Sequence, residues 1–99
     1  MNQQELLSEF DAFALKARAI IEKKNKDYAQ SDALSNFKLS AAVSGISTES
    51  GCLNQISIKC SRLGVLIHKS TVENEPIEDT VVDLFNYAFL LHAILKDKV

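Results

Sequence analysis

Glycine and proline are scarce in this chain, with three glycines and one proline among 99 residues. No stretch alternates apolar and polar residues over a useful length, and apolar residues instead recur at spacings of three and four. The three glycines are widely scattered, which excludes a glycine-rich phosphate loop. The pattern therefore predicts helices throughout.

Other absences restrict the class of protein further. The net charge is −2, so no strongly basic surface is expected and nucleic-acid binding is disfavoured. No apolar stretch approaches the roughly 20 residues needed to cross a bilayer, so we expect no membrane partner. Acids near the N-terminus stand where a secretory signal carries lysines, which predicts a cytoplasmic protein. Cys52 and Cys60 lack the spacing of a metal or redox motif, so we expect two small, buried and reduced side chains.

Apolar periodicity and turn residues predict four helices in one domain that covers residues 1–99. The predicted helices are Gln3–Lys24, a short Ala33–Ser44, Glu49–Lys69 and Pro76–Lys96. Ser31 or Asp32 is expected to cap the second helix, Gly45 to end it, and Ser47 or Thr48 to cap the third.

The last two predicted helices carry apolar side chains on more than one side. A small monomer cannot bury that many apolar positions, so part of the core is expected to lie between subunits. The predicted fold is all-α, a compact four-helix assembly that forms a homo-oligomer, either a dimer or a tetramer.

The most acidic stretch, EPIEDTVVDLFNYA at residues 75–88, raises the question of a metal site. Asp79 and Asp83 lie four residues apart and Asn86 follows after three more, so a helix would place them on one face. Mg²⁺ prefers such oxygen ligands. The alternative is a solvated rim, because acids near the start of a helix are favoured by its dipole alone.

Asp83 stands among apolar residues, and a carboxylate there needs a partner. Lys59 and Arg62, three residues apart on the third predicted helix, share a face and are the candidates. An acidic face against a basic face is either a structural layer of salt bridges or half of a phosphate site. Spacing alone does not separate these alternatives.

A second polar cluster, KKNKDYAQSDALSNFK, covers residues 23–38. It combines lysines with Asp27, Tyr28, Asn36 and Phe37 in a predicted loop. A nucleotide needs a ring surface for its base, donors for the base edge and positive charge for phosphate. The alternative is that Tyr28 and Phe37 pack on the core while the lysines are solvated.

Four segments in this order resemble a family of small phage and prophage proteins called the nucleotide-modification-associated domain. The segments are KNKDYAQSDALSNF, GIS, KCSRLGVLI and EDTVVDLFNYA, within about residues 15–92. The family looks related to the all-α nucleotide pyrophosphatases of the MazG type. The resemblance implies a helical, oligomeric, MazG-like fold that binds a nucleotide between helices, often with Mg²⁺. It implies ligand contacts at Asp27, Tyr28, Asn36, Phe37, Lys59, Arg62, Glu78, Asp79, Asp83, Asn86 and Tyr87.

The chain departs from the pyrophosphatase pattern at one important place. Those enzymes hold Mg²⁺ with acids from two helices, whereas residues 50–72 contain no acid here, and Ile58 stands where an aspartate is expected. Metal-assisted hydrolysis needs several carboxylates to balance the cation, so half of a ligand set disfavours an enzyme.

The sequence therefore predicts a protein without a cofactor that binds a linear or cyclic nucleotide and does not hydrolyse it. In a phage, such a protein could sequester an immune signal in the host cytoplasm by mass action. The first alternative is a Mg²⁺-dependent nucleotide pyrophosphohydrolase with Asp79 and Asp83 as ligands. Its missing acid would come from Glu49, Asp27 or another subunit. The second alternative is a helical interaction protein without a small ligand.

Overall fold

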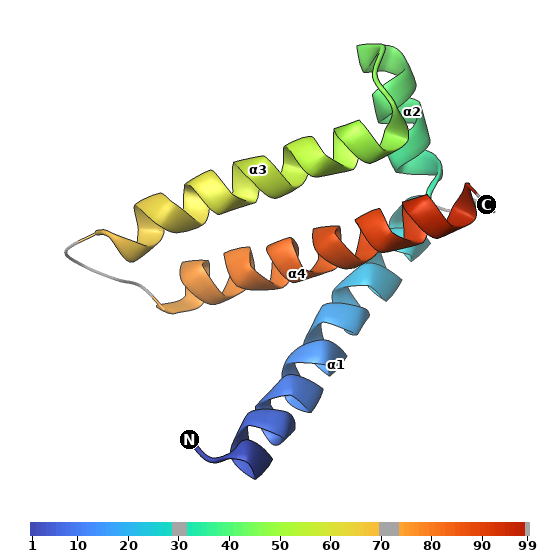
Figure 1. Cartoon of the computed structure of the whole chain (residues 1–99). Coiled ribbons are helices and arrows are strands. Elements are labelled where there is room, and N and C mark those ends of the chain that lie inside the picture. The colour runs from blue at the N-terminus through green and yellow to red at the C-terminus, as the bar shows by residue number, and fades with distance from the viewer. Residues whose placement is uncertain (29–31, 70–73, 99) are drawn as a thin grey trace.

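The computed structural model describes residues 1–28, 32–69 and 74–98, and gives only the helical backbone for 25–28 and 74–76. These residues form four helices and no strand, which confirms the all-α prediction for the described part of the chain. The helices are α1 (Gln3–Tyr28), α2 (Ser35–Ser44), α3 (Thr48–Ile67) and α4 (Asn74–Asp97). Figure 1 shows α3 and α4 side by side, with α2 against the start of α3 and α1 crossing α4.

Two predicted helix boundaries are wrong by several residues. α1 continues to Tyr28 instead of ending at Lys24, so Asp27 lies on a helix and not in a loop. Turn-favouring residues predict helix ends only weakly, because their cost within a helix is small compared with the stability of a long helix. The side chains of Asp27 and Tyr28 lie outside the described residues. α4 starts at Asn74, two residues before the predicted Pro76.

The caps of α2 and α3 follow the predictions in part. Asp32 does not cap α2, which starts after Leu34 without a side-chain cap. The Asp32 carboxylate instead accepts a hydrogen bond from the Leu34 N–H at 2.9 Å and shapes the preceding turn. Gly45 ends α2 as predicted, in the left-handed conformation at φ 72°. Ser47 caps α3 by accepting a hydrogen bond from the Ser50 N–H at 3.2 Å.

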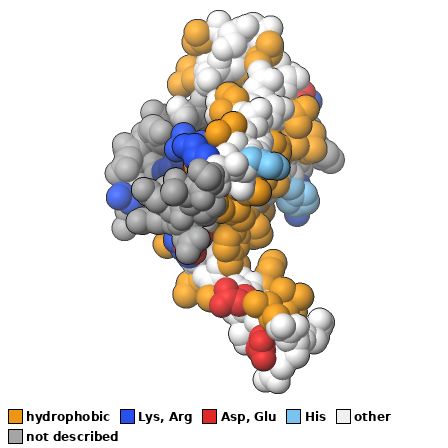
Figure 2. All heavy atoms as spheres, turned by 90° about the vertical axis from the view of Figure 1, so that its left-hand side faces the viewer, with side chains coloured by type: hydrophobic (Ala, Val, Ile, Leu, Met, Phe, Trp, Pro, Cys, Tyr) orange, Lys and Arg blue, Asp and Glu red, His pale blue; other side chains and the backbone are white. Residues whose placement is uncertain are grey.

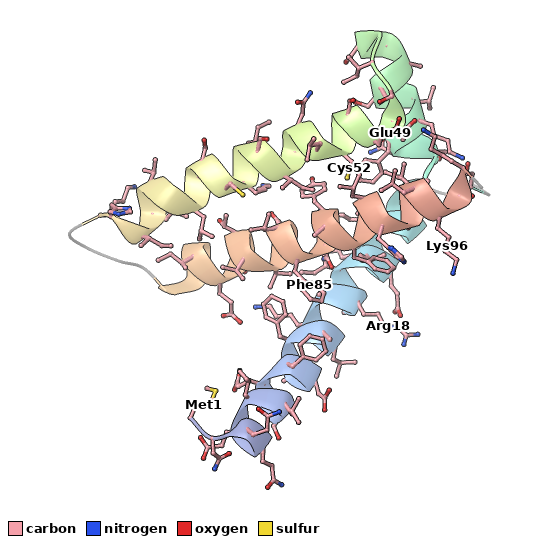
Figure 3. The ribbon with its side chains drawn as sticks, in the orientation of Figure 1. Met1, Arg18, Glu49, Cys52, Phe85 and Lys96 are labelled. Carbon is pink, nitrogen blue, oxygen red and sulfur yellow. The ribbon has the colours of Figure 1, made fainter. Side chains whose placement is uncertain are left out.

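The core lies where α2, α3 and α4 meet. Leu34, Cys52 and Ile94 are buried there, and the thiol of Cys52 reaches the Tyr87 carbonyl oxygen at 3.4 Å (Figure 3). Burial raises the pKa of the Cys52 thiol, as expected for an inert cysteine. The prediction of burial is wrong for Cys60, which is exposed because eight residues of helix turn it by about 80° from Cys52.

The N-terminal half of α1 has little cover. Phe85 of α4 lies against Phe13 and Phe10, with ring centroids 5.1 and 6.4 Å away (Figure 3). Beyond these rings α1 projects from the body with hydrophobic side chains on its surface (Figure 2). Leu6 and Leu7 are each 54% exposed. No helix in the described ranges is both long enough and apolar enough to cross a membrane.

The molecule is more extended than the compact assembly predicted. Its radius of gyration is 15.3 Å, against roughly 12.6 Å for a compact domain of this length. The difference arises because α1, among the described residues, packs mainly on α4 and does not close the helices into a bundle.

Candidate functional site

A cavity of about 100 Å³ lies between the second half of α1, the start of α2 and the middle of α4. Five of the eleven ligand contacts predicted from the sequence line it. These are Asn36, Phe37, Asp83, Asn86 and Tyr87, and they are joined by Ile20, Ile21, Lys24, Ala33 and Leu90.

Helical spacing explains how α4 contributes to the cavity. Asp83, Asn86, Tyr87 and Leu90 follow one another at steps of three, one and three residues, which places all four on one face. On α1, Ile20, Ile21 and Lys24 occupy one face in the same way. Figure 1 shows why the two faces meet, because the second half of α1 crosses α4.

Asn86 is the most buried polar residue of the cavity wall, with 6% of its surface exposed. Its side-chain amide donates a hydrogen bond to the Ala17 carbonyl oxygen of α1 at 3.1 Å. This bond fixes which end of the amide carries the nitrogen, because a carbonyl oxygen can only accept. The Asn86 Oδ1 atom is buried and accepts no hydrogen bond from the described residues. Such an orphaned acceptor is uncommon and requires an explanation.

Two aromatic rings also line the cavity. Phe37 of α2 and Tyr87 of α4 pack edge to face, with centroids 6.2 Å apart and planes at 84°. Both rings also pack against the buried core, so the expected packing role of Phe37 and its place at the cavity are both observed. A cavity with ring surfaces and a few fixed polar groups is typical of a small-molecule site.

Asp83 pairs with Lys59 of α3, as predicted, with 3.2 Å between Nζ and Oδ2. The Lys59 and Asp83 side chains are 21% and 30% exposed, so the pair is shielded from water for the most part. One oxygen of the carboxylate at the cavity edge is thus paired with a cation of α3.

Asp79 and Asp83 pair with different lysines. Asp79 and Glu78 face Lys16 of α1, at 3.9 and 3.2 Å, and all three side chains are largely solvated. Of the alternatives left open by the sequence, Asp79 and Glu78 agree with a solvated rim at the start of the helix. Asp83 agrees with a structural salt bridge between helices.

The described residues do not provide a divalent metal site. They contain no group of three or more His, Cys, Asp or Glu side chains that could hold an ion. Glu49 pairs with Lys98 near the far end of α4. About 22 Å of helix separate residues 83 and 98, so within one chain Glu49 cannot complete a set with Asp83. The side chain of Asp27, the other acid considered, lies outside the described residues.

Arg62 is exposed on α3, does not line the cavity and has no salt-bridge partner among the described residues. Its contact with phosphate stays a prediction, as does the contact of Tyr28. The sequence interpretation missed the contribution of Ile20 and Ile21, because they belong to the apolar stripe of α1 and were expected in the core. It counted Lys24 among the basic residues of the second polar cluster without singling it out as a contact.

Two larger hollows, of about 290 and 570 Å³, lie near the end of α4. The charged side chains of the first are paired, Lys98 with Glu49 and Lys38 with Asp97. The second adjoins the candidate cavity and shares Ile21, Ala33 and Leu90 with it. The smaller cavity is the better site because it alone combines aromatic rings with an orphaned buried acceptor.

Comparisons of this chain with protein-family models, with curated proteins and with solved structures found no match.

Proposed function

We propose that this protein binds a nucleotide-type small molecule at the cavity between α1, α2 and α4 and holds it without hydrolysis. The observation that carries the proposal is the buried Asn86 Oδ1 atom, which accepts no hydrogen bond from the described residues at a cavity walled by Phe37 and Tyr87. A ligand that donates to this oxygen would satisfy it. The resemblance to the nucleotide-modification-associated domain family, with its MazG-like fold, supports the same class of ligand.

Sequestration is favoured over hydrolysis by the way the carboxylates are used. Asp83 and Asp79, the metal ligands of the pyrophosphohydrolase alternative, each face a lysine on a different helix. A cation would have to displace both lysines and bring the two carboxylates together. A protein that binds tightly without chemistry lowers the free ligand concentration in proportion to its own abundance. In a phage this would remove a nucleotide signal from the host cytoplasm.

We further propose that the protein works as a homo-oligomer with a core shared between subunits. Its accessible surface is 7344 Å², about 1,700 Å² more than the roughly 5,600 Å² typical of a monomer of this mass. Stable homodimers cover roughly 1,000–2,500 Å² on each partner, so the excess has the size of such an interface. The uncovered apolar side chains of α1 and α3 would supply it, among them Leu7, Leu53 and Val65.

A nucleotide panel with two readouts tests the proposed function. The panel contains 5′-mono-, di- and triphosphates and cyclic nucleotides of all four bases, each with Mg²⁺ or with EDTA. Thermal unfolding reports binding, and chromatography of the mixture reports turnover. We expect a rise in melting temperature that survives EDTA, with the nucleotide recovered intact. Products that require Mg²⁺ would favour the pyrophosphohydrolase, and no shift with any nucleotide would favour the interaction protein.

A further inference from the structure

Asp83 and Asn86, three residues apart on α4, both line the cavity, and each carries an acceptor oxygen without a hydrogen bond from the described residues. The nitrogen of the Asn86 amide is already committed to Ala17, so only its oxygen is left. Asp83 faces Lys59 with one oxygen, and its other oxygen accepts no hydrogen bond from a described residue. A ligand group that suits this pair carries two N–H donors on one atom.

The rest of the wall decides which end of a nucleotide enters. Ile20, Ile21 and Leu90 are apolar and two aromatic rings add to this lining, while the Asp83 carboxylate repels phosphate. The volume of about 100 Å³ is smaller than the roughly 150 Å³ of a cavity that holds one benzene ring. The cavity therefore suits the edge of a planar base, with the ribose and phosphates outside, near the ammonium group of Lys24.

We propose that the ligand is an adenine or cytosine nucleotide, inserted with its exocyclic amino group toward Asn86 Oδ1 and Asp83. This inference rests on the proposed function and narrows it to bases with an amino group opposite the sugar. Guanine and uracil carry a carbonyl oxygen at the corresponding position, which would face two acceptors and leave both without a donor.

Ligand pairs that differ in this group test the inference on the unaltered protein. Titration calorimetry compares AMP with purine riboside 5′-monophosphate, which lacks only the amino group, and CMP with UMP. We expect the amino-bearing member of at least one pair to bind about tenfold to a hundredfold more tightly, the usual effect of hydrogen bonds to buried or charged acceptors. Because no residue is changed, an altered fold cannot produce the difference.

A pair of variants then assigns the discrimination to Asp83. Asp83→Asn replaces one acceptor oxygen by a donor and should reduce the preference for the amino-bearing ligand by about tenfold. Lys59→Met breaks the same ion pair from the other side and leaves the carboxylate in place, so it should keep the preference. Circular dichroism of both variants monitors the fold.

The outcomes separate this inference from the proposed function. Equal binding within both pairs, or tighter binding of UMP or the amino-free purine, overturns the orientation and leaves nucleotide binding intact. Equal preference in Asp83→Asn and Lys59→Met overturns the role of the carboxylate. If none of the four nucleotides binds and the wider panel is also negative, the proposed function and the inference fail together.

Discussion

A few polar side chains within an otherwise apolar helix carry most of the functional information in this molecule. Asn86 is nearly buried, yet half of its amide has no hydrogen-bond partner among the described residues. An apolar residue at this position would avoid the cost of burying that carbonyl, about 1–3 kcal/mol. Retaining the amide is understandable if a ligand supplies the missing donor.

Asp83 and Asp79 differ in environment, and their substitution should differ in effect. Asp83→Ala leaves the Lys59 ammonium without its partner at a site where both side chains are at most 30% exposed. We expect a loss of about 1–2 kcal/mol in the free energy of unfolding, near the lower end for bonds to charged groups because some water contact remains. Asp79→Ala removes a solvated contact of 3.9 Å and should change the stability far less.

Urea denaturation of the two variants and the parent checks this difference. For a chain of this length, 1 kcal/mol corresponds to roughly 4–8 °C in melting temperature, so thermal scans give an independent reading. Similar losses in both variants would show that Asp83 belongs to the solvated rim, together with Asp79.

Residue types, spacing and the family resemblance together singled out half of the cavity lining, namely Asn36, Phe37, Asp83, Asn86 and Tyr87. The resemblance was needed for Tyr87, which spacing alone did not single out. Apolar lining residues could not be identified, because a cavity wall and a core present the same periodic pattern. Lys59 was a candidate partner of Asp83 from the sequence, whereas the Lys16 partner of Asp79 was not predictable, since it depends on where α1 lies around α4.

At the scale of the helices, two glycines should respond to alanine in opposite directions. Gly45 ends α2 at φ 72°, a conformation that alanine adopts at a cost of roughly 1–2 kcal/mol. Gly64 lies inside α3 with no described atom within 4 Å of an added Cβ, so Gly64→Ala should gain about 0.8–1 kcal/mol in helix propensity.

Chemical denaturation of Gly45→Ala and Gly64→Ala measures both effects with the same substitution. A loss of stability in Gly64→Ala would reveal a neighbour that the single chain lacks, such as a second subunit against α3. Gly51 is unsuitable as a control, because an added Cβ would already lie 3.6 Å from Ala41 of α2.

Exposed ion pairs fasten α2 and α3 to the end of α4, and they make this end sensitive to acid. Lys38 bridges Asp32 and Asp97, at 2.6 and 3.0 Å, and Lys98 contacts Glu49 at 2.9 Å. The hydrogen bond from Lys38 lowers the pKa of Asp32 below 3.8, and the one from Lys98 lowers the pKa of Glu49 below 4.5. The two carboxylates raise the pKa of Lys38 above 10.5.

The direction of the pH dependence follows from these shifts. The lowered carboxyl pKa values stabilise the fold above about pH 4.5, and this contribution disappears as the pH falls through the folded-state values. The raised pKa of Lys38 stabilises the fold below about pH 10.5, and this contribution is lost as the pH rises further. Melting temperatures from pH 2 to 6 should therefore rise more steeply in the parent than in the double variant Lys38→Met/Lys98→Met. Identical slopes would show that these pairs contribute nothing.

The type and order of the helices were predictable from the sequence, whereas their ends were not always. Apolar residues recur at spacings of three and four over enough residues to identify each helix. Gly45 marks the end of α2 because glycine adopts the left-handed conformation, and Ser47 marks the start of α3 because its side chain caps the helix. Asn25 and Asp27 favour turns, but α1 continues through them, because local preferences of a few tenths of a kcal/mol do not end a long helix.

At the scale of the whole molecule, the accessible surface of 7344 Å² is larger than that typical of an isolated chain of this mass. Among the described residues α1 packs mainly on α4, and its first half carries Leu6, Leu7 and Phe10 more than half exposed. A projecting helical segment of about three turns is marginal in water without packing, so a covering surface would stabilise it. A second copy of the chain presents the same apolar stripe, and a twofold contact of α1 with α1 would cover both.

Light scattering coupled to size exclusion should therefore give the mass of two or four chains at micromolar concentration, not the 11.0 kDa of one. Leu7→Glu places a charge in the proposed interface and should shift the protein toward the single-chain mass. Val43→Glu is the matched control, because Val43 is 87% exposed on α2, away from the α1 stripe, and should leave the mass unchanged. A parent protein that elutes as a single chain would refute the shared core, while dissociation by both variants would place the contact beyond α1.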